Sequence, residues 1–563
     1  MAKKTGCRIL LDGLKREGVK DIFGYPGGAV IPLFDTLMDY DFNFVLVRHE
    51  QGAAHAADGY ARATGRVGVC VATSGPGATN LVTGIATANM DSVPMVAITG
   101  QVKTHLIGND AFQEADVTGI TRPITKYNYL VKDVRDLARV VREAFHYAST
   151  GRPGPVVIDL PVDVSAATLD EREVDRALHT PGYKPTVEGN ERQIRRAAEA
   201  INAAERPLVY AGGGCIISGC HREIKQLAVN GRIPVTTTLL GLGCFPETHA
   251  LALEMLGMHG TVYANYAVSN CDLLVAVGAR FDDRVTGKIS AFAPKAKVLH
   301  IDIDPTAISK SIRVDIPIVG DARNVLKRLV PLVKRRPRKK WLAQVAGWKA
   351  KYPLRYKPTG LRPQFVVETI CKLTKGRETV ITTEVGQNQM WAAQFYKYTK
   401  PRTFLSSGGL GTMGYGLPAA IGAQVGRPDA LVVDIAGDGS IQMNIQELCT
   451  AVNAGAPVKV VVLNNSYLGM VRQWQELFYK RRYAHTSMAG SPDFVKLAEA
   501  YGALGLRVKR KKDLEPTLKR AFKHAGPVVV DVHVTPEENV WPMVPAGKSL
   551  SEMDGLTILE SMA

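Results

Sequence analysis

The pattern of apolar positions divides the chain into three stretches of alternating strand and helix. Short apolar runs, such as residues 67–73, 273–277 and 458–463, are separated by helix-like stretches. Uninterrupted apolar runs of this length are typical of parallel strands that are buried on both faces. The pattern predicts an α/β fold with three doubly wound parallel-sheet domains. We place these domains at residues 1–165, 190–330 and 361–545.

Two polar stretches separate the predicted domains. Residues near 165–190 contain prolines 181 and 185, and residues 331–362 are basic and interrupted by prolines. Both are predicted to be linkers. The dense basic run at residues 334–340 also fits a nucleic-acid patch, but a solvated linker is the preferred interpretation.

Composition narrows the class of protein. The 563 residues are 46% hydrophobic and 22% charged, which is ordinary for a soluble protein. No apolar run reaches the roughly 18–20 residues of a membrane helix, and residues 1–5 lack the apolar core of a signal peptide. The eight cysteines form no CxxC pair, which argues against zinc or a disulfide scaffold. We therefore expect a cytoplasmic enzyme with no membrane or nucleic-acid partner, whose net charge of +17 suits anionic ligands.

The strongest chemical signal lies in the third stretch. The predicted strand 431–435 ends in a Gly-Asp-Gly at residues 437–439, and the strand 458–463 ends in Asn464 and Asn465. The 24 residues between Gly439 and Asn464 suit a βαβ crossover, which brings both strand ends to one edge of the sheet.

The residue types at this edge suit a metal and a diphosphate. Asp438 and Asn465 offer hard oxygen ligands for Mg²⁺. Gly437 and Gly439 let the backbone approach a phosphate, and a helix predicted to begin near Ser440 favours its negative charge. A GxxxxGK[ST] motif is absent from the sequence, which argues against a P-loop nucleotide site. The alternative is a structural turn with an Asp helix cap.

The motif resembles the fingerprint of thiamine-diphosphate enzymes. By that resemblance, Asp438 and Asn465 bind Mg²⁺ through their side chains and Tyr467 through its carbonyl. The likeness covers nearly the whole chain, from residues 22–28 to 541–545, and is greatest to acetohydroxyacid (acetolactate) synthase catalytic subunits. Residues 469–475 are its most selective stretch.

The resemblance implies both an architecture and a reaction. The three domains would be pyrimidine-binding, central FAD-binding and Rossmann-like, and diphosphate-binding. The enzyme would decarboxylate pyruvate and join the two-carbon unit to pyruvate or 2-oxobutyrate, giving 2-acetolactate or 2-aceto-2-hydroxybutyrate. This is the first common step of branched-chain amino acid biosynthesis. The cofactors would be thiamine diphosphate, Mg²⁺ and a structural FAD, because the reaction moves no net electrons.

Glu50 is the candidate acid–base carboxylate. From the sequence alone it is a carboxylate in the first turn of a helix, where Glu is common, among small residues that permit burial and a raised pKa. The resemblance implies that it hydrogen-bonds the pyrimidine ring of thiamine diphosphate. It also implies that Glu50 of one subunit faces the diphosphate site of another. The minimal active unit would then be a dimer, and the protein a homodimer or homotetramer.

Five further residues are assigned to the reaction centre by resemblance. Gly27 and Gln113 would line it, and Met413 would support the bent cofactor. Trp474 would shape the pocket of the second oxo acid, although an ordinary core aromatic is the alternative. Arg284 would bind the carboxylate of that acid, for which a guanidinium is suited; a surface ion pair is the alternative.

The resemblance also assigns cofactor-binding residues in all three domains. In the first domain they are Tyr25, Pro26, Glu50, Pro76, Asn80 and Arg152. In the central domain they are Gly212, Gly213, Thr238, Leu239, Met258, His259, Gly260, Gly278, Arg280, Asp282, Val285, Asp302, Ile303, Asp321 and Ala322. In the third domain they are Gly386, Gln387, Asn388, Gln389, Met390, Gly411, Met413, Gly437, Asp438, Gly439, Ser440, Met443, Asn465, Tyr467, Leu468, Gly469 and Met470.

Two positions depart from the family pattern. Val162 stands where Lys is frequent, which would affect the mouth of the active site. Asn388 stands where His is common and could still donate to a diphosphate oxygen through its amide.

Rival interpretations remain. Another thiamine enzyme, such as glyoxylate carboligase, pyruvate oxidase or a simple decarboxylase, would share the core motifs, and a non-catalytic nucleotide-binding protein would share the layout. A regulatory small subunit is implied by resemblance alone.

Overall fold

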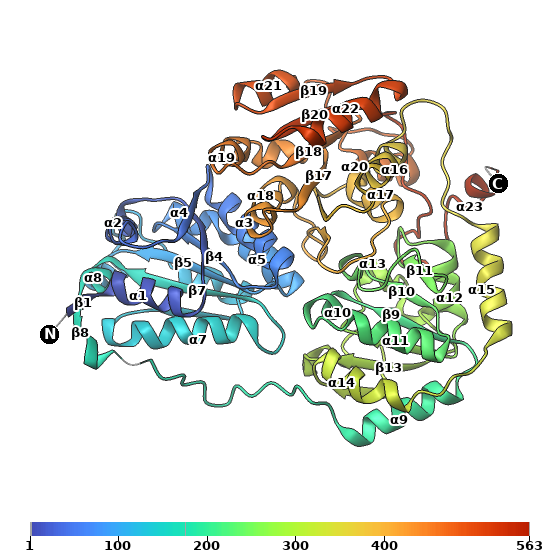
Figure 1. Cartoon of the computed structure of the whole chain (residues 1–563), viewed down its shortest axis with the longest axis horizontal. Helices are drawn as coiled ribbons and strands as arrows, with labels where there is room; N and C mark the ends of the chain where they lie inside the picture. The colour runs from blue at the N-terminus through green and yellow to red at the C-terminus, as the bar shows by residue number, and fades with distance from the viewer. Residues whose placement is uncertain (1–2, 175, 562–563) are drawn as a thin grey trace.

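Three six-stranded parallel sheets organise the chain in the computed structural model, which describes residues 3–174 and 176–561. Met1 and Ala2, at the start of the first predicted domain, lie outside the described residues. Figure 1 shows the first sheet at the left, the central sheet at the lower right and the third sheet at the top. The predicted fold class is confirmed. None of the helices in the described ranges is long and apolar enough to cross a bilayer.

The first sheet has the strand order β3-β2-β4-β5-β7-β6. Its strands are β2 (Asp21–Gly24), β3 (Asn43–Leu46), β4 (Gly68–Ala72), β5 (Met95–Gln101), β6 (Tyr127–Leu130) and β7 (Pro155–Pro161). Its helices are α1 (Gly6–Arg16), α2 (Ile31–Leu37), α3 (Glu50–Thr64), α4 (Pro76–Asn80), α5 (Val82–Asp91), α6 (Val117–Thr121), α7 (Leu137–Ser149) and α8 (Val162–Ala166). Strands β4, β5 and β7 are buried throughout, as their uninterrupted apolar runs predict.

The central sheet has the order β11-β10-β9-β12-β13-β14, which is the 3-2-1-4-5-6 order of dinucleotide-binding domains. Its strands are β9 (Pro207–Ala211), β10 (Val235–Thr237), β11 (Ala252–Met255), β12 (Leu273–Val277), β13 (Lys297–Asp302) and β14 (Ile316–Val319). Its helices are α9 (Glu191–Ala203), α10 (Gly213–Ile217), α11 (His221–Gly231), α12 (Val262–Asn270), α13 (Asp283–Thr286), α14 (Ala322–Leu329) and α15 (Lys339–Lys351).

The third sheet has the order β16-β15-β17-β18-β20-β19. Its strands are β15 (Thr379–Thr383), β16 (Phe404–Leu405), β17 (Leu431–Gly437), β18 (Lys459–Asn464), β19 (Leu504–Val508) and β20 (Val528–His533). Its helices are α16 (Pro363–Thr374), α17 (Gln387–Phe395), α18 (Gly416–Gly426), α19 (Glu447–Asn453), α20 (Gly469–Phe478), α21 (Phe494–Ala500) and α22 (Lys511–Lys523), and α23 (Leu556–Ser561) follows. Counted along the chain, this order is 2-1-3-4-6-5, which is also the order of the first sheet.

Helices α3 and α18 join the first and third domains. A Cβ on Gly59 would lie 2.2 Å from the carbonyl oxygen of Ala419, and one on Gly422 would lie 1.8 Å from that of Ala56. Such contacts mean that the two helix backbones touch, which glycine alone permits. The first and third sheets are therefore packed against each other through these two helices.

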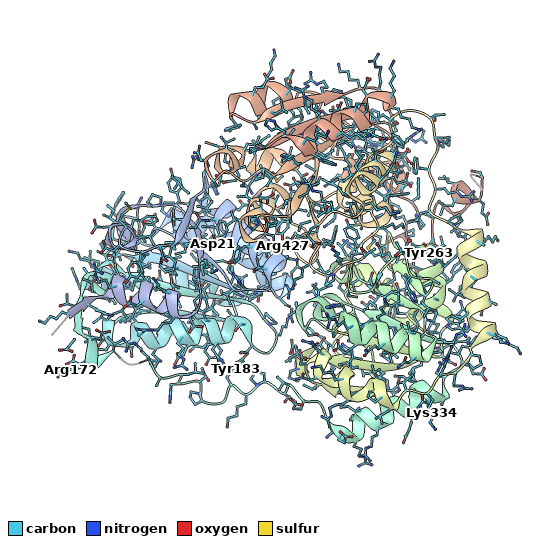
Figure 2. The ribbon with its side chains drawn as sticks, viewed as in Figure 1. Asp21, Arg172, Tyr183, Tyr263, Lys334 and Arg427 are labelled. Atoms are coloured by element: carbon cyan, nitrogen blue, oxygen red, sulfur yellow. The ribbon has the colours of Figure 1, made fainter. Side chains whose placement is uncertain are left out.

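The first linker is extended but anchored. It crosses below the first domain in Figure 1, and Figure 2 labels Tyr183 on it. The Tyr183 hydroxyl donates to the carbonyl of Thr150 at 2.8 Å and accepts from the Lys126 ammonium at 2.7 Å. At its start, β8 (Thr168–Asp170) pairs antiparallel with β1 (Lys3–Thr5).

The second linker differs from the prediction. It contains the 13-residue helix α15, whose Trp341 and Val345 are buried against the central domain. Arg338, in the basic run, is only 8% exposed, and its guanidinium donates to the carbonyl of Ile201 at 2.6 Å and to those of Ala204 and Gly231. The interpretation as a solvated linker is therefore wrong for this part of the segment. Lys334, labelled in Figure 2, lies on the stretch before α15.

Candidate active site at the sheet edges and in the central cavity

The carboxyl edge of the first sheet carries Glu50. Glu50 begins α3 directly after β3, and its half-buried carboxylate accepts a hydrogen bond from the Asn80 amide at 2.9 Å. A Cβ on Gly77 would lie 3.3 Å from the same carboxylate. Two predicted residues from different helices, Glu50 and Asn80, are thus brought together. The expected burial of Glu50 is only partial within a single chain.

Gly27 and Gln113 lie along the same edge. A Cβ on Gly27 would lie 2.5 Å from the Thr73 side chain, and one on Gly75 would lie 2.7 Å from the carbonyl oxygen of Gln113. Gln113 itself has a φ of +59°, which is unusual for a residue other than glycine. Beside it, the Phe112 side chain is 89% exposed. Strained backbone of this kind is concentrated at functional sites.

At the edge of the third sheet, Asp438 follows β17. It is 1% exposed, and its Oδ2 has no hydrogen-bond partner. Burial raises the pKa of Asp438 to about 7, and the backbone amides of Asn465 and Ser466 offset part of this effect. A buried carboxylate oxygen without a partner is costly. A cation at this position would remove that cost.

Asn465 lies beside Asp438 and is held by its neighbours. Its Oδ1 accepts from the backbone N–H of Tyr467 at 3.1 Å, and its amide donates to the Gln387 side chain at 3.2 Å. No group of three or more His, Cys, Asp or Glu side chains that could hold a metal ion occurs among the described residues. The donor set here is instead one carboxylate, one amide and main-chain oxygens, which suits Mg²⁺.

A helix begins near Ser440 as predicted, but it is a 3₁₀ helix and not an α-helix. Residues 441–444 form a short 3₁₀ turn, and the α-helix α19 begins only at Glu447. The Asn444 amide donates to the carbonyl of Gly414 at 2.7 Å, which ties this turn to a distant segment. The helices α17 and α20 begin at this edge instead, at Gln387 and Gly469.

The role predicted for Asn388 is wrong. Its amide nitrogen donates to the carbonyls of Glu384 at 3.0 Å and Ile435 at 2.8 Å. Both amide hydrogens are therefore used within the protein, and none is free for a diphosphate. Asn388 instead ties the end of β15 to the end of β17, the two strands between which the direction of the sheet connections changes. The other departure, Val162, is half-buried at the start of α8.

Met413 lies in a glycine-rich segment between β16 and α18. Gly411 and Gly414 have φ values of +74° and +87°. The fully buried Glu384 accepts from the backbone N–H of Gly414 at 2.7 Å and from that of Leu417 at 3.3 Å. Burial, together with the nearby Asp434, raises the pKa of Glu384. This carboxyl group fixes the end of the segment on which Met413 is half-buried.

A cavity of about 610 Å³ opens at the carboxyl edge of the central sheet. Ligands bind at such an edge where the strand order reverses, here between β9 and β12. Most of the cofactor-binding residues that the resemblance assigned in the central domain line this cavity, together with some from the other two domains. They are Gly213, Thr238, Leu239, Met258, His259, Gly278, Arg280, Asp282, Val285, Asp302, Ile303, Asp321 and Ala322, with Arg152 from the first domain and Gly386, Gln389, Met390, Gly411 and Met470 from the third.

Gly212 and Gly260 do not line the cavity. A Cβ on Gly212 would lie 2.1 Å from the carbonyl oxygen of Gly278, and one on Gly260 would lie 2.3 Å from the backbone of Leu256. Both glycines therefore permit close backbone packing behind the cavity wall. The cavity fits a dinucleotide because it combines this tight turn after β9 with the acidic Asp302 at the end of β13.

Arg284 and Trp474 meet in the same cavity. The guanidinium lies 5.6 Å from the centroid of the indole ring, a cation–π distance. Trp474 is only half-buried, so it is a cavity residue and not an ordinary core aromatic. The Arg284 side chain is 57% exposed, and its nearest acidic partner, Asp283, is 3.8 Å away. A solvent-accessible cation beside an aromatic face is therefore available to an anionic ligand.

His259 lines the cavity as a neutral group. Burial, reinforced by the charge of Arg284, lowers the pKa of His259 to about 4. Its Nδ1 lies 3.4 Å from the carbonyl of Pro542, in the segment that packs onto the central domain beyond β20. Val544 of the same segment donates its backbone N–H to the carbonyl of Met258 at 2.8 Å.

Several cavity residues were missed from the sequence. They are Met90, Asp91, Ser92, Tyr210, Gly214, Leu240, Asp304 and residues 407–410. The run of Gly408 and Gly409 was a usable signal for close approach to a ligand. Asp91 matched no motif in the sequence, because its partners Gly408 and Gly409 lie 317 and 318 residues away.

The comparisons with known proteins agree with this geometry. Family models of thiamine pyrophosphate enzymes match residues 4–120 (N-terminal TPP binding domain), 194–329 (central domain) and 384–532 (C-terminal TPP binding domain). The acetolactate synthase large subunit of Porphyra purpurea is 51% identical over 99% of this chain and 96% of its own length. The acetolactate synthase isozyme 3 large subunit of Escherichia coli is 48% identical over 98% and 99%. A probable acetolactate synthase large subunit of Methanocaldococcus jannaschii is 50% identical over 97% and 95%. The chain belongs to the acetolactate synthase large subunits, a family of thiamine pyrophosphate enzymes.

Proposed function

We propose that the chain makes 2-acetolactate from two molecules of pyruvate, or 2-aceto-2-hydroxybutyrate from pyruvate and 2-oxobutyrate. The first pyruvate loses CO2, and its remaining two carbons form a bond to the keto carbon of the acceptor, whose oxygen takes up a proton. Thiamine diphosphate, when bound, supplies the electron sink for the loss of CO2. The products are the precursors of branched-chain amino acids.

The pairing of Arg284 and Trp474 in the central cavity carries this proposal. A decarboxylase releases its two-carbon product and needs no site for a second acid. Here an accessible guanidinium lies 5.6 Å from the indole centroid, which supports binding of the acceptor carboxylate beside a shaped apolar wall. The cavity also meets the third domain at Gly386, Gly411 and Met470.

Each remaining residue has a positioning or proton-transfer role. Glu50 holds a proton at the pyrimidine ring of thiamine diphosphate, and Gly27 and Gln113 line the space above it. Met413 would help to hold the bound cofactor, which is positioning and not chemistry. Asp438, Asn465 and the carbonyl of Tyr467 would hold Mg²⁺, whose charge would offset that of a diphosphate. FAD would be held in the central cavity as a structural group.

Oligomerisation completes the site. Glu50 is only half-buried within one chain. No hydrogen bond among the described residues joins Glu50 or Asn80 to Asp438 or Asn465. This supports a homodimer or homotetramer in which Glu50 of one subunit serves the diphosphate site of another. The relatives are named large subunits, which supports a separate regulatory small subunit for this chain.

The test is a product assay with pyruvate, Mg²⁺, thiamine diphosphate and FAD. Acetolactate as the main product supports the proposal, with Arg284→Ala as the discriminating variant. We expect that variant to raise the KM of the acceptor at least about tenfold, because its carboxylate loses a charge-assisted partner. Acetaldehyde, or peroxide formed with oxygen, as the main product of the unaltered protein would instead indicate a decarboxylase or an oxidase.

A further inference from the structure

One segment of the third domain contacts the first domain and also lines the cavity of the central domain. We call residues 407–415 the glycine-rich segment. Its residues 407–411 line the central cavity, while Met413 and Tyr415 follow within the same nine residues. A displacement of this segment would therefore change both the wall of the cavity and the position of Met413.

The first domain holds this segment through Asp91, the last residue of α5. Its carboxylate accepts from the backbone N–H of Gly408 at 3.0 Å and from that of Gly409 at 2.7 Å. The Asp91 side chain is fully buried. Two backbone donors on one buried carboxylate fix the position and direction of the peptide that carries them.

A buried ion network supports Asp91 from behind. The guanidinium of Arg62 bonds Asp91 at 2.8 Å and Asp58 at 2.6 Å, and its side chain is 12% exposed. The hydroxyl of Tyr415, at the end of the glycine-rich segment, donates to Asp58 at 2.6 Å. One guanidinium faces two carboxylates here, so the backbone N–H groups of the segment supply the remaining partners for Asp91.

The segment packs closely against this network on one side. A Cβ on Gly409 would lie 2.6 Å from Asp91 and 3.0 Å from the guanidinium of Arg280, which also lines the cavity. Further along, the hydroxyls of Thr412 and Thr87 are 2.7 Å apart and buried. The segment thus lies between the first domain and the central cavity, with Leu410 exposed.

We propose that Asp91 is a positioning residue that couples the two cofactor sites, so that a dinucleotide in the central cavity and thiamine diphosphate beside Met413 strengthen each other's binding through the glycine-rich segment. This inference rests on the proposed function, since it takes the occupants of both sites from it. The coupling is reciprocal, because each ligand must change the affinity of the other by the same factor.

The test measures the Kd of FAD by flavin fluorescence, with and without thiamine diphosphate and Mg²⁺. In the unaltered protein we expect thiamine diphosphate to lower the Kd of FAD about threefold or more. In Asp91→Asn we expect this factor to fall to one, and both cofactors to bind about tenfold more weakly. Asp12→Asn is the matched control, because Asp12 is an ion-paired carboxylate of the same domain whose partners are Lys4 and Tyr40; its coupling factor should stay unchanged.

Two results would overturn the inference: a factor of one in the unaltered protein, or an unchanged factor in Asp91→Asn. A purely structural role for Asp91 would lower the thermal midpoint and leave the factor intact. If Asp91→Asn does not fold, Asp91→Glu keeps the charge and displaces the segment, and an unchanged factor there has the same meaning. An unaltered protein that binds neither cofactor would contradict the proposed function itself.

Discussion

The first and third sheets share one strand order but present carboxylates in different environments at their edges. Both follow the order 2-1-3-4-6-5, and both bury their central strands on both faces. Their carboxyl edges differ. The first presents the half-buried Glu50, which is hydrogen-bonded to an amide, whereas the third presents the enclosed Asp438 with an unpartnered oxygen.

This difference shows what the strand order determines and what it leaves open. The topology brings several strand ends to one edge in each sheet, which makes a ligand site available. The side chain that follows a given strand then decides the chemistry. A carboxylate near solvent can exchange a proton, while a buried one beside an amide suits a metal. The central sheet, with its different order, forms the dinucleotide-type cavity.

Glu50→Gln should abolish proton transfer at the edge of the first sheet and leave cofactor binding at the edge of the third sheet unchanged. The amide keeps the shape of Glu50 and cannot hold the proton, so we expect kcat to fall about 10³-fold or more. The Kd of thiamine diphosphate should change by less than about threefold. Glu171→Gln, which alters an exposed carboxylate paired with Lys4, is the control. Near-normal turnover in Glu50→Gln would remove Glu50 from the reaction.

Asp438→Asn should give the converse result. Loss of the charged ligand should weaken Mg²⁺-dependent binding of thiamine diphosphate about 10²-fold, because the metal loses its only carboxylate here. Calorimetric titration of cofactor with Mg²⁺ would measure this effect. Asp429→Asn changes an exposed carboxylate of the same domain and should bind normally. Unchanged cofactor affinity in Asp438→Asn would show that the edge of the third sheet does not bind the metal through Asp438.

Gly422→Ala tests the packing between the two sheets. The new methyl would overlap the carbonyl of Ala56, so we expect a loss of about 1–3 kcal/mol in the free energy of unfolding. Gly347→Ala is a matched control at an exposed position of helix α15, where a Cβ meets nothing within 4 Å. It should stabilise by up to about 1 kcal/mol. Equal effects in denaturant titrations would mean that the α3–α18 contact does not constrain the fold.

His55, at the same contact, should make stability depend on pH. It is fully buried against Tyr415, and burial, reinforced by the charge of Arg62, lowers the pKa of His55 to about 3. The unfolded chain binds a proton below its ordinary pKa of 6.5 and the folded chain does not, so stability falls as the pH falls from 6.5 towards 3. The slope should reach about 1.4 kcal/mol per pH unit. His55→Phe keeps the ring and should lose this contribution; an identical pH profile would contradict it.

Local pattern was enough to predict the sheets. The predicted runs 67–73, 273–277 and 458–463 match β4, β12 and β18 to within one residue at each end, because each is a short apolar stretch bounded by turns. The helix α15 was missed because its basic residues concealed the apolar spacing of Trp341, Val345 and Trp348, which is the spacing of one helix face.

The finer details of the site depend on contacts between distant segments. The 3₁₀ turn after Ser440 is tied to Gly414 by Asn444, and Asn388 has no free donor because it bonds two strand ends. Asp91 is chemically ordinary in the sequence and important only through the peptide that it faces. Residue type and spacing cannot express such pairings, because each needs a partner from another part of the fold.

The crossing of α3 and α18 at Gly59 and Gly422 has a mechanical consequence. Where two backbones touch without intervening side chains, they cannot rotate or slide past each other unless the contact is first broken. This contact therefore favours movement of the first and third domains of one chain as a single unit. Loops at the sheet edges, such as the one carrying the exposed Phe112, lie outside the contact and are not constrained by it.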